Sequence, residues 1–273
     1  MNIIRFALCL PILVTIANNR AFAQTELPTL VPSSDLETFA DWCHARDGIN
    51  ASARHTVNEL LVLAETTDCD RANERLLAMR ILSLGGTDVT NLEPLATLPH
   101  FDEIFLWGNG IRDITPLAVM KNLTRANLAG NYIVDLSPLA DLEQLTWLEL
   151  SSNFIYDVSA LAELDNLQDL YLAVNAIADP SPLASLNNLS HLVLAWNEVT
   201  ELDGLAAAPQ LSKIDARFNN IAHLETLTNF AMLERIYLRG NPLAEPLCPL
   251  VAATICQFTD ADFEDAPRLE LAD

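Results

Sequence analysis

The chain has 273 residues, of which 51% are hydrophobic, and its formal net charge is −22. This length and apolar content allow a sizeable core in one large domain or two small ones. The acidic balance disfavours nucleic acids and anionic membrane surfaces as partners, because both attract basic patches. With only eight glycines, glycine-rich phosphate-binding loops are not expected either.

Residues 1–23 have the pattern of a secretory signal peptide. Arg5 supplies the charged start, residues 6–17 form an apolar stretch of 12 residues, and 21–23 form an A-x-A cleavage site. The stretch is too short to cross a bilayer, although an uncleaved N-terminal membrane anchor is the alternative. We therefore expect export to the periplasm or the medium, a linker over 24–33, and a mature chain without an integral membrane segment.

Four cysteines remain after the expected cleavage: Cys43, Cys69, Cys248 and Cys256. An even number of cysteines in an exported chain favours disulfides. Two lie near each end of the chain, so Cys43–Cys69 and Cys248–Cys256 are the economical pairs. Zinc binding is the rival interpretation, but no C-x-x-C motif or nearby pair of histidines supports it.

One asparagine recurs at a fixed interval of 22 residues. The series is Asn109, Asn131, Asn153, Asn175, Asn197, Asn219 and Asn241. Thr87 holds the same register one step earlier, and apolar residues recur eight, five and three positions before each of these residues and two after it. Such a fixed period predicts a stacked solenoid rather than a single globule.

The pattern Leu-x-x-Leu-x-Leu-x-x-Asn-x-Ile resembles the leucine-rich repeat signature, and eight coils of it cover residues 79–246. The 22-residue length and the second half "DxxPLAxL" are similar to the repeats of bacterial internalins. The segments "FADWC" and "CPL…ICQF" also resemble the ends of a group of exported bacterial leucine-rich repeat proteins. The resemblance implies an α/β solenoid: a leucine-rich repeat horseshoe with a parallel concave sheet, 3-10 turns on the convex side, a helical N-terminal cap and a disulfide-bonded C-terminal cap.

Within this fold the recurring asparagines have a structural role. Each coil would turn inward at its Asn and leave backbone groups between coils, and an amide side chain can both donate to and accept from them. In the second half of the coil, Ser–Pro and Thr–Pro pairs such as Ser137–Pro138 are expected to cap a short helical turn with the hydroxyl. An acidic column four residues after the Asn suits the start of that turn, with metal binding the alternative. The column is Asp113, Asp135, Asp157, Asp179 and Glu201.

Both ends of the solenoid need caps, because a terminal coil would expose its leucines. Residues 34–78 show helical spacing, and Ser34 with Glu37 is expected to form a capping box. Residues 247–259 replace the next repeat. The final segment, 260–273, is an acidic tail that lacks a calcium-loop motif and is expected to be solvated.

No motif in the sequence assembles a catalytic, metal or cofactor site. The five histidines show no metal-ligand spacing, and neither a nucleophile-elbow motif nor a P-loop motif is present. The histidines are His44, His55, His100, His191 and His223. We therefore expect a protein that is not an enzyme and that needs no cofactor.

Side chains alternate along a strand, so residues six, four and two before each Asn should face the concave surface. The candidate binding residues at these positions are Phe105, Trp107, Trp147, Tyr171, Lys213, Arg217, Arg235, Tyr237 and Arg239. Trp196 and Phe218, one residue before the Asn, fall near the edge. A row of exposed aromatics favours partner binding. Mutual packing of the rings, and simple charge compensation by the bases, are the alternatives.

Together these patterns predict an exported, monomeric binding module that holds a protein ligand on its concave face. A glycan-binding or cell-envelope recognition protein is the alternative. In that case Trp107, Trp147 and Tyr171 would stack on sugar rings.

Overall fold

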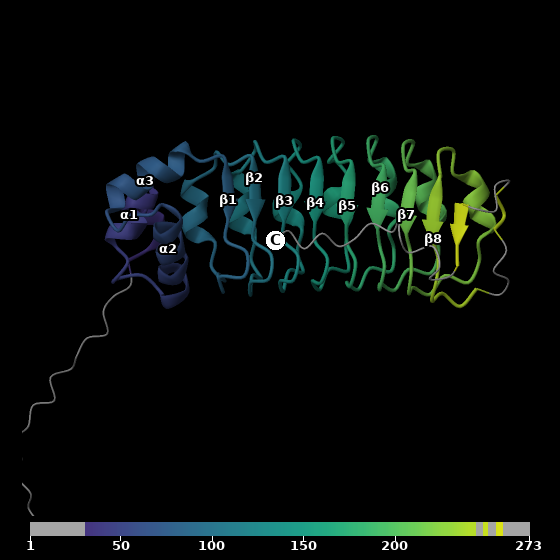
Figure 1. Cartoon of the computed structure of the whole chain (residues 1–273), viewed down its shortest axis with the longest axis horizontal. Coiled ribbons are helices and arrows are strands. Elements are labelled where there is room, and N and C mark those ends of the chain that lie inside the picture. The colour runs from purple at the N-terminus through teal and green to yellow at the C-terminus, as the bar shows by residue number, and fades with distance from the viewer. Residues whose placement is uncertain (1–30, 244–247, 251–254, 259–273) are drawn as a thin grey trace, which may run out of the picture.

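The computed structural model describes residues 31–243, 248–250 and 255–258. The expected signal peptide, most of the linker and the acidic tail lie outside these residues. Three helices form one end of the molecule, and a single row of parallel strands in chain order extends from them (Figure 1). This is the leucine-rich repeat solenoid that the 22-residue period predicts.

The helical cap covers the first coil. Its elements are η1 (Ser33–Asp35), α1 (Phe39–His44), α2 (Ala51–Leu63) and α3 (Cys69–Ala78). Phe39, Val57 and Leu60 are fully buried between the helices, and the Cys43–Cys69 disulfide joins α1 to the start of α3. The apolar faces of these helices therefore merge with the leucine core of the solenoid.

The capping box of this domain is formed by Thr38 and Asp41, so the expectation for Ser34 and Glu37 was wrong. The Thr38 hydroxyl accepts from the Asp41 amide at 3.2 Å, and the Asp41 carboxylate accepts from the Thr38 amide at 2.8 Å. Ser34 lies in the separate 3-10 turn η1, which ends at the extended residue Leu36. The extended backbone there prevents a helix from running from Ser34 into α1.

The sheet has nine parallel strands, and neighbours in the sheet are neighbours in the chain. They are β1 (Ile81–Ser83), β2 (Glu103–Phe105), β3 (Arg125–Asn127), β4 (Trp147–Glu149), β5 (Asp169–Tyr171), β6 (His191–Val193), β7 (Lys213–Asp215), β8 (Arg235–Tyr237) and β9 (Cys256–Gln257). From β1 to β8 each residue pairs with the residue 22 positions later, as Leu82 does with Ile104. Equivalent side chains therefore form straight columns across the sheet.

A short 3-10 turn lies on the convex side of each of the seven coils that contain β1 to β7. These turns are η2 (Glu93–Thr97), η3 (Thr115–Val119), η4 (Ser137–Leu139), η5 (Ser159–Leu161), η6 (Ser181–Ser185), η7 (Asp203–Ala207) and η8 (Glu225–Asn229). Ser and Thr hydroxyls do not cap them, contrary to expectation, because Thr115 and its equivalents are already the first residues of their turns. The preceding aspartate provides the acceptor instead: the Asp113 carboxylate accepts from the Thr115 amide at 2.8 Å.

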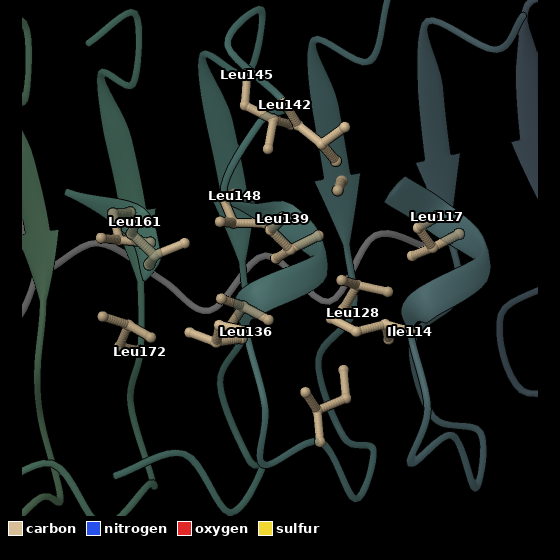
Figure 2. Close-up of a cluster of buried hydrophobic side chains, with 14 of the residues drawn as sticks. Ile114, Leu117, Leu128, Leu136, Leu139, Leu142, Leu145, Leu148, Leu161 and Leu172 are labelled. Carbon is tan, nitrogen blue, oxygen red and sulfur yellow. The ribbon is translucent and has the colours of Figure 1, made fainter. Parts of the chain in front are cut away.

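The core is the space between the strands and the convex turns. Leu136, Leu139 and Leu142 of one coil, and Leu145 and Leu148 of the next, point into this space (Figure 2). Each is at most 2% exposed. Because neighbouring coils bury their leucines against one another, the stability of each coil depends on the coils beside it.

The recurring asparagines link successive coils through the backbone. The Asn131 amide group donates to the carbonyl oxygens of Leu106 at 3.0 Å and Leu128 at 2.9 Å, and its oxygen accepts from the Ile111 amide at 3.1 Å. Asn153 makes the equivalent contacts one coil later. Thr87, at the first coil, donates through its hydroxyl to its own coil alone, at Leu84.

The residue immediately before Thr87 and before each of these asparagines has a left-handed backbone. Four coils place glycine there, at Gly86, Gly108, Gly130 and Gly240. Four others place Ser152, Val174, Trp196 and Phe218, with φ between 54° and 59°. Left-handed φ is uncommon for residues that carry a Cβ and is strained for β-branched or bulky ones. Three coils therefore hold large side chains at a position that favours glycine.

The last strand belongs to the C-terminal cap. β9 pairs with β8 through Ile236–Cys256 and Tyr237–Gln257, and the Cys248–Cys256 disulfide ties β9 to the preceding segment. Cys256 is buried against the core. The disulfide-bonded cap expected over 247–259 is thus present where the structure describes that range.

Candidate functional site

The concave face consists of three side-chain columns, six, four and two residues before each recurring Asn. All nine predicted binding residues lie in these columns, as the strand register shows. Lys213 is exposed and Tyr237 is buried, whereas the other seven are half-buried. The columns bring the residues together in separate groups along the row of strands rather than in one patch.

The central group is an aromatic pair on β4 and β5. The ring centroids of Trp147 and Tyr171 lie 5.6 Å apart. On the other side of Trp147, the Arg125 guanidinium lies 4.8 Å from its ring centroid, and Arg125 also approaches the Glu103 carboxylate at 3.9 Å. The group therefore offers half-buried aromatic surface beside a cation, a combination common at protein interfaces.

Trp107 packs on the preceding coil rather than with this pair. A Cβ atom added to Gly85 would lie 2.4 Å from the Trp107 indole, so the ring rests directly on the Gly85 backbone. Part of the predicted aromatic row is thus used for packing within the sheet. Phe105 lies on β2, two strands before Trp147 on β4.

The basic group lies on and just after β7 and β8. Arg217 donates through Nε to Asp215 at 2.8 Å and forms a second contact through its other guanidinium nitrogen. The Asp215 side chain is 1% exposed, so this pairing offsets one of the four bases. Arg239 lies 5.4 Å from the ring of Phe218, and Lys213 is the most solvent-exposed base of the group.

Glu149, which lies on β4 and pairs with Tyr171 in the strand register, is a buried carboxylate that sequence reasoning missed. It is 4% exposed, and its Oε1 accepts from the Ser151 amide at 2.7 Å. Burial raises the pKa of the Glu149 carboxyl above its ordinary value. Among the described residues no Lys, Arg or His forms an ion pair with it, whereas Asp169 on the next strand pairs with His191 at 2.9 Å.

A second surface follows the edge of the sheet, where the strands turn at the recurring Asn. We call it the edge row: Tyr132, Phe154, Tyr156, Val174, Trp196 and Phe218. Tyr132 stacks on Phe154 with centroids 5.8 Å apart, and Trp196 stacks on Phe218 at 4.1 Å. Trp196 is 56% exposed and Tyr156 is 65% exposed. The edge position of Trp196 and Phe218 was foreseen. The other members could have been found as aromatic or β-branched residues one or three positions after the Asn, or one before it.

The acidic column serves the convex turns. Hydrogen bonds from Thr115, Ser159 and Ser181 lower the pKa of Asp113, Asp157 and Asp179, respectively. These carboxylates accept from the backbone at the start of each turn, as the expectation for that column required. In the described ranges no group of three or more His, Cys, Asp or Glu side chains could hold a metal ion.

Solved structures share this arrangement of strands and turns. The chain superimposes on internalin C2 of Listeria monocytogenes with a TM-score of 0.66 and 31% sequence identity, covering 74% of this chain and 91% of that protein. The chain belongs to the internalin-like leucine-rich repeat proteins. No protein-family model matches the sequence, and no curated protein matches it.

Two further structures show how far the internalin-like fold extends. An internalin of Listeria monocytogenes (inlF) has 24% identity and a TM-score of 0.65 over 70% of this chain, which spans 57% of that protein. A leucine-rich repeat protein of Leptospira interrogans has 22% identity and a TM-score of 0.57 over 62% of this chain, which spans 45% of it. Both likenesses concern the fold alone. None of the helices in the described ranges is long and apolar enough to span a bilayer.

Proposed function

We propose that this internalin-like chain is an exported, monomeric, non-enzymatic binding module that holds a protein ligand on its concave face. The observation that carries the proposal is the central group, where Trp147 and Tyr171 pair beside Arg125. Aromatic and arginine side chains supply most of the binding energy in many protein interfaces. Export is supported by the two disulfides, which persist in oxidising compartments.

A protein fits this face better than a glycan does. The Trp147 and Tyr171 rings are tilted by 50° to each other, so they do not form one flat platform for a sugar chain. Charged side chains also alternate across the sheet beside them, with Glu103 next to Arg125 and Asp169 next to His191. An extended surface of rings and charges of both signs matches the composition of protein interfaces.

The test is capture of partners from a cell-envelope extract on immobilised mature protein, followed by affinity measurements with variants. Trp147→Ala and Tyr171→Ala should each weaken the binding of the captured protein by about 2 kcal/mol or more, which is roughly 30-fold in Kd. Phe154→Ala is the matched control, because it removes an exposed aromatic side chain from the edge row rather than from the concave face.

The controls separate the possible binding surfaces. If Phe154→Ala abolishes binding while both concave variants bind like the parent, the ligand occupies the edge row and the proposal is wrong. If soluble oligosaccharides compete for the site, and if binding is lost only in the Trp147 and Tyr171 variants, a glycan ligand would be favoured instead. All variants should unfold at the parental midpoint, so that loss of binding is not loss of fold.

A further inference from the structure

The edge row contains all the fully exposed rings of the described ranges. These are Tyr132, Phe154, Tyr156 and Trp196, and the other Phe, Tyr and Trp side chains in those ranges are buried or half-buried. The row lies at the edge of the sheet toward which the strand arrows point (Figure 1), and it extends from the coil of β3 to the coil of β7. Four strand spacings make it about 19 Å long. Apolar surface gathered in this way marks an interaction site rather than scattered exposure.

Three members of the row hold a backbone conformation that does not suit them. Val174, Trp196 and Phe218 have φ of 57°, 59° and 54°, at the position where four other coils carry glycine. Glycine fits such a turn without strain, so folding does not require a bulky residue there. Val174 and Trp196 are nevertheless 46% and 56% exposed. Backbone strain that folding does not require is typical of functional sites.

The rings at one end of the row are held in place. Trp196 and Phe218 stack with their planes 16° apart. Phe218 in turn rests on the backbone of Gly240, where an added Cβ atom would lie 2.4 Å from its ring. Side chains that are already fixed lose little conformational freedom when a partner covers them. The edge row is therefore a preformed apolar surface.

The charge beside the middle of the row is negative. Residues 126–212 contain no Lys or Arg, whereas Asp135, Asp157 and Asp179 each follow a recurring Asn by four residues and are exposed. Hydrogen bonds from the convex turns lower the pKa of Asp157 and Asp179, so both are ionised at neutral pH. This combination of rings and carboxylates complements a partner that carries apolar and basic side chains.

A hollow of about 600 Å³ lies between the segments that follow β5 and β6, which also carry Val174 and Trp196. The position three residues after the Asn is Tyr156 in one coil but Ala178 and Thr200 in the next two, and these smaller residues leave the space open. The acidic side chains that line the hollow are Asp179, Glu201 and Asp203. None of them forms an ion pair with a base in the part of the chain that the structure describes. The hollow therefore offers uncompensated carboxylates to a Lys or Arg side chain.

We propose that the edge row binds a basic amphipathic helix of a partner protein, with apolar side chains on the rings and a Lys or Arg side chain in the hollow. A helical turn rises about 5.4 Å and neighbouring coils lie about 4.8 Å apart, so each turn meets one coil. About 14 helical residues cover the row. The net charge of −22 opposes both a second copy of this chain and an anionic membrane as the occupant. The inference does not rest on the proposed concave-face ligand, because no residue of the three concave columns takes part.

A designed peptide tests the proposal with the full chain. The probe has about 15 residues of Leu, Lys and Ala, with leucines every three and four positions so that they form one helical stripe. Fluorescence anisotropy of the labelled peptide should give a Kd below about 1 mM in low salt. The affinity should fall at least about tenfold at about 1 M NaCl, where the Debye length is about 3 Å. A peptide of the same composition with its leucines spread around the helix should bind about tenfold more weakly than the striped one.

Trp196→Gly separates binding from folding. The variant gives its coil the residue that four other coils carry, so the fold should be retained while the affinity for the peptide falls at least about tenfold. Tyr156→Ala, at a side chain that is 65% exposed, should have a similar effect and keeps the test valid if Trp196→Gly lowers the unfolding midpoint.

Charge substitutions test the hollow. Glu201→Gln combined with Asp203→Asn should weaken the peptide about tenfold in low salt and much less at about 1 M NaCl. Glu143→Gln combined with Glu163→Gln is the matched control. It makes the same change in charge at exposed residues of the segments that lead into β4 and β5, and it should leave the affinity close to that of the parent.

Four outcomes overturn the proposal. One is no binding at about 1 mM peptide, and another is equal binding of the striped and scrambled peptides, which would show attraction by net charge alone. If Trp147→Ala abolishes binding while Trp196→Gly and Tyr156→Ala bind like the parent, the peptide occupies the concave face, and the proposed function is untouched. If the protein forms a dimer that Trp196→Gly dissociates, a second copy occupies the edge row.

Discussion

Replacing Asn153 by Ala tests the hydrogen-bond ladder that joins the coils. The Asn153 amide donates to Leu128 at 3.0 Å and Leu150 at 2.9 Å, and its oxygen accepts from the Ile133 amide at 3.0 Å. The Leu128 carbonyl also accepts from Asn131, and the Leu150 carbonyl from Asn175. Both carbonyls therefore keep one partner in the variant.

The Ile133 amide has no second hydrogen-bond acceptor among the described residues. It is buried and would lose its acceptor, at a cost of about 1–3 kcal/mol, and the two weakened carbonyl contacts add about 1 kcal/mol. We therefore expect Asn153→Ala to lower the free energy of unfolding by about 3 kcal/mol. Asn153→Asp should not rescue it, because a carboxylate would keep the acceptor but point its second oxygen at two carbonyl groups.

Urea unfolding followed by circular dichroism measures the effect. Asn187→Ala is the matched control, because it removes an Asn hydrogen bond of 2.9 Å to Asp165 at an exposed site, and it should cost less than about 0.5 kcal/mol. Equal urea midpoints for Asn153→Ala and the parent would refute the expected loss of stability. They would mean that water satisfies the Ile133 amide and that the ladder is not buried.

Three further predictions follow from particular contacts. Non-reducing peptide mapping should find both caps closed by the disulfides described above and no free thiol, whereas Cys43 joined to Cys248 would contradict both caps. Glu149→Gln should stabilise the protein at pH 7. Because the pKa of Glu149 is raised in the folded protein, the neutral carboxyl contributes its full stability below pH 4.5, the ordinary pKa of the group, and that stability is lost as the pH rises. The stability gained by Glu149→Gln should therefore vanish when unfolding is measured in acid. Val174→Gly should raise the free energy of unfolding by about 1 kcal/mol, because relief of the left-handed strain exceeds the extra conformational entropy that glycine loses on folding. A lower unfolding midpoint would argue against strain there.

The period of the sequence predicted the coils, because burial demands the same apolar positions in every repeat. Leu148 and Leu170 had to face inward if Asn153 and Asn175 were to turn the chain, and the strand register follows from that. The same reasoning placed Trp147 and Tyr171 on the concave face. Both disulfide pairs could be predicted as well, because each pair of cysteines lies at one end of the repeats.

Two kinds of feature could not be predicted from the sequence: the choice between two equally suitable capping residues, and contacts between side chains of different coils. Thr38 and Ser34 both stand three residues before an acid, and only the path of the chain through Leu36 selects Thr38. The position of Trp107 against Gly85, and the burial of Glu149, arise from side chains that are 22 residues apart and meet only in three dimensions. A single repeat carries no signal of such contacts.

Because the register of the sheet is fixed, groups in one column of the concave face are separated by whole numbers of strand spacings. Trp147 on β4 and Arg235 on β8 occupy the same column, four strands apart, a distance of about 19 Å. Loss or gain of one 22-residue coil between them would change that distance by one strand spacing and leave the chemistry of both ends untouched. A ligand that contacts both groups must therefore present its own contacts at a spacing that this protein can adjust only in whole coils.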